Sequence, residues 1–194
     1  ARFETLQYGE VFRLQRDSIY NYRNGIMHSQ NLDDLVDRLV KRVADQYLDQ
    51  RDAKEADVVD FIYRYIDSKY VVTKDLNALS NAELKQVLID IMYQSIDLKH
   101  EELPHAAQWI YYQRLCFLKA IDGAWVEQVD NLEVLKTLTK SRSVAQRNPM
   151  FEYQKEARKA YAKMRLNMNL LALQNLTSSE INYQKDGTID VKFP

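Results

Sequence analysis

Two long apolar repeats in residues 106–178 constrain this chain more than any other feature. Apolar side chains recur mostly at three- and four-residue steps from Trp109 to Leu135, and the pattern returns from Ala157 to Leu171. This period is typical of amphipathic α-helices. The sequence therefore predicts a helical hairpin whose arms, each of about 30 residues, are on the order of 45 Å long at about 1.5 Å per residue. A rod of this kind forms no catalytic pocket of its own.

A short polar stretch, residues 141–149, separates the two repeats. An asparagine side chain can accept a hydrogen bond from the free N–H groups that begin a helix, and proline is favoured at the first helical position. Asn148 is therefore the predicted N-cap of the returning helix, and Pro149 its first residue. The loop should be presented at the end of a rigid rod.

Few residues in the rest of the chain interrupt helices. Four glycines and three prolines in 194 residues, together with 46% apolar residues, favour an all-helical globular fold. The single cysteine, Cys116, lies in an apolar run and is predicted to be a buried thiol in a reducing compartment. No stretch reaches the roughly 18 uninterrupted apolar residues that would span a bilayer, and no signal peptide pattern precedes the first helix. We therefore expect a soluble protein or a fragment of one.

The first long helix is predicted at residues 2–27. It carries a narrow seam that could contact another helix over its whole length. Further apolar residues widen its surface, and we expect Phe3, Leu6 and Val11 to remain partly exposed as a docking surface. The seam consists of Tyr8, Phe12, Gln15, Ile19, Tyr22 and Ile26.

The sequence of residues 31–103 predicts an acidic helical module. A helix is predicted at residues 32–48, a short helix follows residue 55, and residues 68–79 form a loop that could be extended at residues 70–73. Ser80 and Glu83 fit a capping box at the start of another helix. In the tail, alternating apolar residues surround Asp186-Gly187, which predicts a small β-hairpin.

Charge is unevenly distributed along the chain. Residues 31–102 contain 16 acidic and 10 basic side chains, whereas residues 136–165 contain nine basic side chains and only Glu152 and Glu156 as acids. The hairpin end suits anionic lipid, acidic loops of a partner or phosphate backbones, although a solvated helix face accounts for several lysines equally well. Nucleic acid is the least favoured partner because the basic cluster lacks interleaved aromatic residues.

Motifs of catalysis and metal binding are missing from the sequence. It has no glycine-rich phosphate loop and no Cys/His cluster with metal spacing. Asp122 and Trp125 could serve as an acid and an aromatic platform, but such a pair more often anchors a helix. His100 and His105 flank two glutamates and could bind a metal incidentally, yet a helix junction is the better interpretation. Tyr161, Met164 and Met168 could line a peptide groove, although core packing is favoured.

Two separated blocks of residues, which lie within residues 2–29 and 115–170, form an ordered pattern. The first block consists of Tyr8, Val11, Gln15, Arg16, Ile19, Tyr20, Arg23 and Asn24, and the second of Asp122, Trp125, Glu127, Leu135, Arg142, Ala145, Gln146, Pro149, Glu152, Tyr153, Glu156 and Met164. Both blocks resemble the SecA family, the motor ATPases of bacterial protein secretion. The first is similar to the long scaffold helix of that family, and the second to its two-helix finger at the same spacings.

The resemblance implies a domain organisation and two functional surfaces. Residues 1–29 and 106–178 would be the helical scaffold, residues 30–105 the helical wing and residues 179–194 a tail. The scaffold interface would consist of Tyr8, Phe12, Gln15, Arg16, Ile19, Tyr20, Arg23, Asn24, Asp122 and Trp125. The finger tip, which would contact the channel and the preprotein, would consist of Lys140, Arg142, Ser143, Val144, Ala145, Gln146 and Arg147.

The resemblance also implies a function for the longer parent protein. The chain would couple an ATP-driven motor to preprotein movement through a SecY-type channel, and its partners would include the motor domains of the same polypeptide and an anionic membrane surface. ATP and Mg would bind outside this chain, which alone should hold no cofactor and hydrolyse no ATP. The parent would be cytoplasmic and peripheral on the inner face of the plasma membrane, and homodimer formation stays open. The alternative is a standalone helical adaptor that binds a membrane or a partner through the basic hairpin end.

Departures from the family pattern point to one branch of it. Gln128 stands where the family commonly has histidine, Glu133 where it has aspartate, and Val144 where many members have a tyrosine at the finger tip. The tail also lacks the cysteine-rich zinc-binding end of many housekeeping members. These differences resemble an accessory SecA of a Gram-positive bacterium, the paralogue that exports a restricted set of surface proteins.

Overall fold

The computed structural model describes residues 2–52, 57–142 and 148–194. The chain divides into two compact units: the first comprises Ala1–His28 and Ile121–Met168, and the second Ser29–Ala120 and Asn169–Pro194. Within the described ranges, six α-helices and one two-stranded sheet form the fold, so the predicted mainly α-helical class with a small β-hairpin is confirmed. The predicted domain boundaries at residues 30, 106 and 179 remain predictions.

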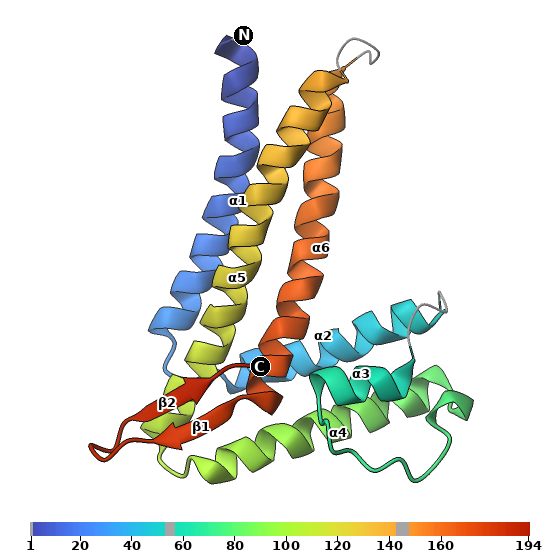
Figure 1. Ribbon diagram of the computed structural model, residues 1–194, viewed down its shortest axis with the longest axis vertical. Helices are drawn as coiled ribbons and strands as arrows, with labels where there is room; N and C mark the ends of the chain where they lie inside the picture. Colours follow the sequence, from blue (N-terminus) through green and yellow to red (C-terminus); the bar gives the residue numbers. More distant parts are fainter. Residues whose placement is uncertain (1, 53–56, 143–147) are drawn as a thin grey trace. The chain divides into compact units, whose positions relative to one another are not determined.

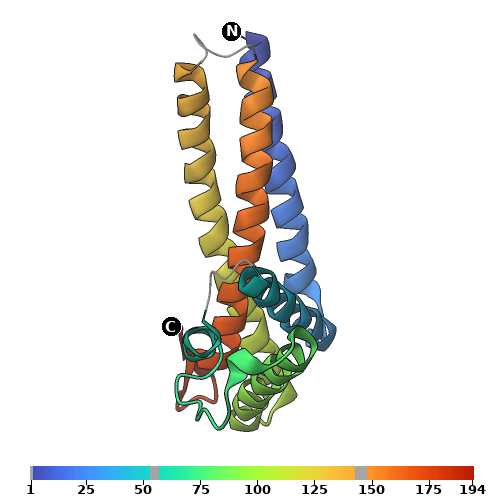
Figure 2. The ribbon, with the colours of Figure 1, turned by 90° about the vertical axis from the view of Figure 1, so that its right-hand side faces the viewer.

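Three long helices build the first unit. The helix α1 (Arg2–His28) runs beside the later part of α5 (Ala106–Ser141) and the first part of α6 (Pro149–Ser178) in both views (Figure 1, Figure 2). The predicted hairpin arms therefore form, with α1 along them. The core of this unit contains Tyr8, Leu132, Tyr153 and Ala157, with Val11, Phe12, Leu135 and Met150 packed around it.

The two helices of the hairpin end and begin at the predicted residues. The outgoing helix ends at Ser141 and the returning helix begins at Pro149. The side-chain oxygen of Asn148 accepts a hydrogen bond from the backbone N–H of Phe151 at 3.1 Å, which confirms Asn148 as the N-cap. Residues 143–147 lie outside the described part of the chain.

In the second unit, α2 (Asp33–Asp52) and α4 (Asn81–Glu102) are linked by polar contacts. The hydroxyl of Tyr93 donates to Asp37 at 2.6 Å, and Lys85 pairs with Asp45 at 2.6 Å. The unit also contains α3 (Val58–Tyr65) and a 3₁₀ turn, η1 (Leu76–Ala78). Ser80 and Glu83 form the predicted capping box at the start of α4.

A buried hydrogen-bond network joins the start of α5 to the end of α6 in the second unit. The Tyr112 hydroxyl lies 3.0 Å from the carbonyl oxygen of Asn175 and 2.7 Å from that of Leu176, and the Asn175 amide donates to the carbonyl of Cys116 at 3.0 Å. Cys116 is fully buried, as predicted, and burial raises the pKa of its thiol to about 12. This cysteine is therefore packed as a structural side chain.

The tail forms the predicted β-hairpin. The strands β1 (Glu180–Tyr183) and β2 (Ile189–Lys192) pair antiparallel, with Ile181 opposite Val191. Gly187 has a φ of 84°, a left-handed conformation that glycine adopts without strain. The carboxylate of Asp186 accepts two hydrogen bonds from Thr188, which lower the pKa of that carboxyl group.

Two details of the second unit concern apolar residues. Leu98 belongs to the apolar pattern of α4, but 62% of its surface is exposed. Residues 70–73 lie in the predicted loop and are not part of a β-strand.

Candidate scaffold interface and hairpin end

The seam of α1 packs into the hairpin through aromatic rings. The rings of Tyr8 and Tyr153 meet edge to face with centroids 4.6 Å apart. Tyr153 is only 2% exposed, and burial, followed by the nearby Glu133, raises the pKa of its hydroxyl to about 12. Phe12 lies against Trp125 at 5.7 Å. These rings join α1 to both arms of the hairpin.

A buried polar contact crosses the same interface. The side-chain amide of Gln15 donates to the backbone carbonyl of Ala157 at 3.2 Å, and its oxygen accepts from the amide of Gln128 at 3.0 Å. One side chain of α1 thereby contacts both α5 and α6. Gln128 is fully buried, and its oxygen has no hydrogen-bond partner among the described residues.

Further along α1, an ion pair links this helix to α5. The guanidinium of Arg23 donates to both carboxylate oxygens of Asp122, at 2.9 and 3.3 Å. Since Asp122 is bound in this way and Trp125 packs on Phe12, their arrangement fits the anchoring interpretation of this pair. The Arg23–Asp122 ion pair is partly exposed to water, so its contribution to the stability of the fold should be within about 1 kcal/mol.

The remaining predicted interface residues occupy different positions. Ile19 is buried, and Arg16 lies over the Phe12 ring at 5.8 Å. Tyr20 and Asn24 are exposed, so their side chains lie outside this packing.

The described end of the hairpin is basic. The ammonium groups of Lys136 and Lys140 lie 5.9 and 5.1 Å from the centre of the Tyr8 ring, within the range of a cation–π contact. Arg142 is exposed one residue beyond the end of α5. The predicted tip residues Ser143, Val144, Ala145, Gln146 and Arg147 lie outside the described residues, and their predicted role stays a prediction.

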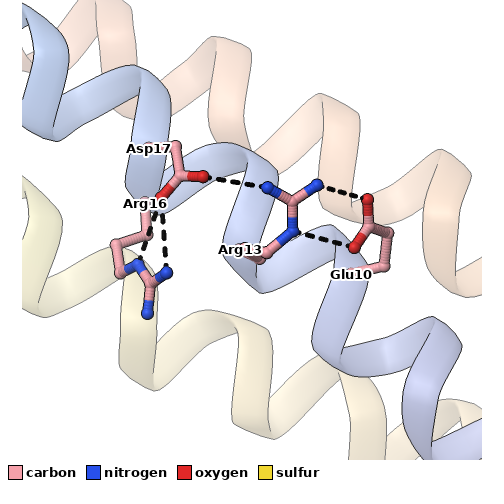
Figure 3. A network of polar contacts seen from close by, with 4 residues as sticks. All are labelled: Glu10, Arg13, Arg16 and Asp17. Carbon is pink, nitrogen blue, oxygen red and sulfur yellow. Dashed lines mark hydrogen bonds and ion pairs between the residues drawn. The ribbon is translucent and has the colours of Figure 1, made fainter.

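A charged network on α1 was not singled out from the sequence. Arg13 contacts Glu10 at 2.6 Å and Asp17 at 3.0 Å, and Asp17 also accepts from Arg16 (Figure 3). The hydrogen bond from Arg13 lowers the pKa of the Glu10 carboxyl group. The spacing of three and four residues between these charges was the available signal.

No metal centre is found among the described residues. No group of three or more His, Cys, Asp or Glu side chains there could hold an ion. His100, which the sequence left open as a metal ligand, stacks on Trp109 with ring centroids 4.4 Å apart.

Among the helices of the described residues, none has the length and apolar character needed to cross a membrane.

These observations define a helical scaffold: one long helix held along both arms of a hairpin with a basic end. A family model described as the SecA Wing and Scaffold domain matches residues 1–180. The chain belongs to this family, which confirms the resemblance noted in its sequence.

Several curated relatives are similar over the whole chain. Protein translocase subunit SecA 2 of Pediococcus pentosaceus is 32% identical over 197 residues, and the protein of the same name from Streptococcus agalactiae serotype V is 31% identical over 198 residues. The corresponding protein of Staphylococcus haemolyticus is 29% identical over 200 residues. The chain spans only about a quarter of the length of these relatives, since it covers 24% or 25% of each. Their shared name agrees with the predicted similarity to an accessory SecA.

Proposed function

We propose that this chain is the scaffold and wing part of a longer, ATP-driven protein translocase, and that its hairpin meets the channel through which the preprotein passes. The observation that carries this proposal is the family match over residues 1–180, because it includes both α1 and the whole hairpin. The relatives are named as translocase subunits, and the chain covers one quarter of them. The motor, with its ATP and Mg, would lie in the rest of the polypeptide.

The hairpin is suited to transmitting movement because α1 braces it. Aromatic contacts, a buried carboxamide pair and the Arg23–Asp122 ion pair hold α1 against the parts of both arms that belong to the first unit. A braced rod can carry a displacement from one end to the other with little bending. Motor domains of the same polypeptide would dock on exposed apolar residues of α1, of which Phe3 and Leu6 are 71% and 67% exposed.

The basic hairpin end would be attracted to acidic channel loops and to anionic lipid on the inner face of the plasma membrane. Both attractions are long-range and should weaken as the salt concentration rises. The parent protein would accordingly be cytoplasmic and peripheral on the membrane. Charge at the tip is therefore the feature to test.

Reversing two charges at the tip should impair export without stopping the motor. With Arg142→Glu and Arg147→Glu in the longer protein, we expect export to fall by about tenfold or more, because each surface cation contributes about 1 kcal/mol near an anionic surface. Basal ATP hydrolysis should stay nearly unchanged. Export and hydrolysis are to be measured in parallel on membrane vesicles.

A matched control reverses two exposed cations of the second unit, Lys69→Glu and Lys74→Glu, and should leave export near normal. Normal export with the tip variant would refute the assignment of the hairpin end. Loss of basal hydrolysis would instead indicate that the tip has a structural role.

A further inference from the structure

A groove runs between α1 and α6 in the first unit. Its volume is about 470 Å³. Val11, Leu14 and Tyr161 provide its apolar lining, and Leu14 is 56% exposed. The lining on α1 extends from Gln7 to Gln15, which corresponds to about 12 Å or two helical turns. The groove therefore has the length and the apolar character to receive side chains from about two turns of another helix.

The two rims of this groove differ in charge balance. On the α1 rim, Arg13 binds the carboxylates of Glu10 and Asp17, and Arg16 also binds Asp17, so two carboxylates face two guanidinium groups (Figure 3). On the α6 side, Lys155 and Arg158 are exposed, and neither has an ion-pair partner in the described part of the chain. Arg158 itself lines the groove. The charges of the α1 rim are thus paired with one another, whereas Lys155 and Arg158 form no ion pair with any described residue.

We infer that this groove binds an amphipathic helix that carries carboxylates on one side. Its apolar side chains, spaced at three and four residues, would lie against Val11, Leu14 and Tyr161. Its carboxylates would face Arg158 and Lys155, which fixes the orientation of the helix across the groove. An elongated groove favours a helix over a flat membrane surface, because a helix can place successive apolar side chains against Val11, Leu14 and Tyr161 along its length. This inference does not depend on the proposed role in export.

Binding of a defined peptide to the 194-residue chain tests the inference. The probe is a fluorescein-labelled 18-residue model helix with leucine and alanine on one face and glutamate on the other, and fluorescence anisotropy reports its binding. An otherwise identical peptide with glutamine in place of glutamate should bind about tenfold more weakly. Arg158→Glu with Lys155→Glu should weaken binding of the acidic peptide by a similar factor, and Leu14→Glu should abolish it.

Two control variants separate this groove from the general charge and apolarity of the surface. Lys163→Glu reverses an exposed cation of α6 that does not line this groove, and Leu6→Glu changes an exposed leucine of α1 outside it. Both should bind the acidic peptide as the unmodified chain does. Circular dichroism on all variants should show unchanged helix content, since every replaced side chain is exposed.

Three outcomes would overturn the inference. The first is no binding of the acidic peptide at millimolar concentration. The second is equal weakening by Lys163→Glu and Arg158→Glu, which would show that basic charge acts without the groove. The third is unchanged peptide binding in Leu14→Glu together with Arg158-dependent binding to phosphatidylglycerol vesicles, which would assign the rim to a lipid surface.

Discussion

Replacing Tyr153 by alanine should lower the free energy of unfolding of the first unit by about 3–5 kcal/mol, the usual cost of removing a large buried aromatic side chain. Tyr153 is 2% exposed, and its ring contacts Tyr8 at the centre of the core that joins α1 to the hairpin. The cavity would lie between all three helices. Hydrogen exchange measured by mass spectrometry at increasing urea concentrations resolves this unit from the second.

Tyr153→Phe is the matched control because it keeps the ring and removes only the hydroxyl group. Its cost should stay below about 1.5 kcal/mol, as for other shape-conserving replacements in a core. Equal destabilisation by the two variants would mean that the hydroxyl group, and not the ring, stabilises this interface.

Gln15→Leu should destabilise the first unit by about 1–3 kcal/mol, which is the cost of leaving a buried polar group without its hydrogen bond. Gln128 is fully buried, its oxygen already has no partner in the described residues, and its amide donates only to Gln15 among them. The variant would therefore leave the whole carboxamide unsatisfied. The measurement is the same exchange experiment.

The double variant Gln15→Leu with Gln128→Leu distinguishes a polar contact from simple packing. When both partners become apolar and keep a similar size, the desolvation cost disappears, so most of the lost stability should return. The cost of the double variant should be at least about 1 kcal/mol below the sum of the single variants. Additive costs would show that the two glutamines do not interact across the interface.

Local features of this fold could be predicted because they depend on neighbouring residues. The helical period, the Asn148 N-cap, the Ser80 capping box and the Asp-Gly hairpin each act over at most a few residues. The burial of Ile19 followed from the same periodicity. Leu98 shows the limit of this reasoning, since an apolar residue in a helical pattern can still face water.

The candidate interface was only partly predictable, because its contacts join residues far apart in the chain. Gln15 and Gln128 are separated by 113 positions, and nothing in their local sequence identifies them as partners. The family resemblance also named Arg23 and Asn24 together, although only Arg23 binds Asp122 and Asn24 is exposed. The proposed function rests on the family resemblance, since apolar periodicity alone indicates no more than a helical scaffold.

Photo-crosslinking from the hairpin in the longer protein tests the central claim most directly. A photoreactive amino acid is placed at Leu138, which is 43% exposed near the end of α5, or at Val126, which is 64% exposed on the same helix about 18 Å earlier. If the hairpin end meets the channel during export, position 138 should crosslink to a channel subunit far more strongly than position 126, and only with preprotein and ATP present. Equal yields at the two positions, or no channel crosslink from position 138 in an actively exporting system, would contradict the account.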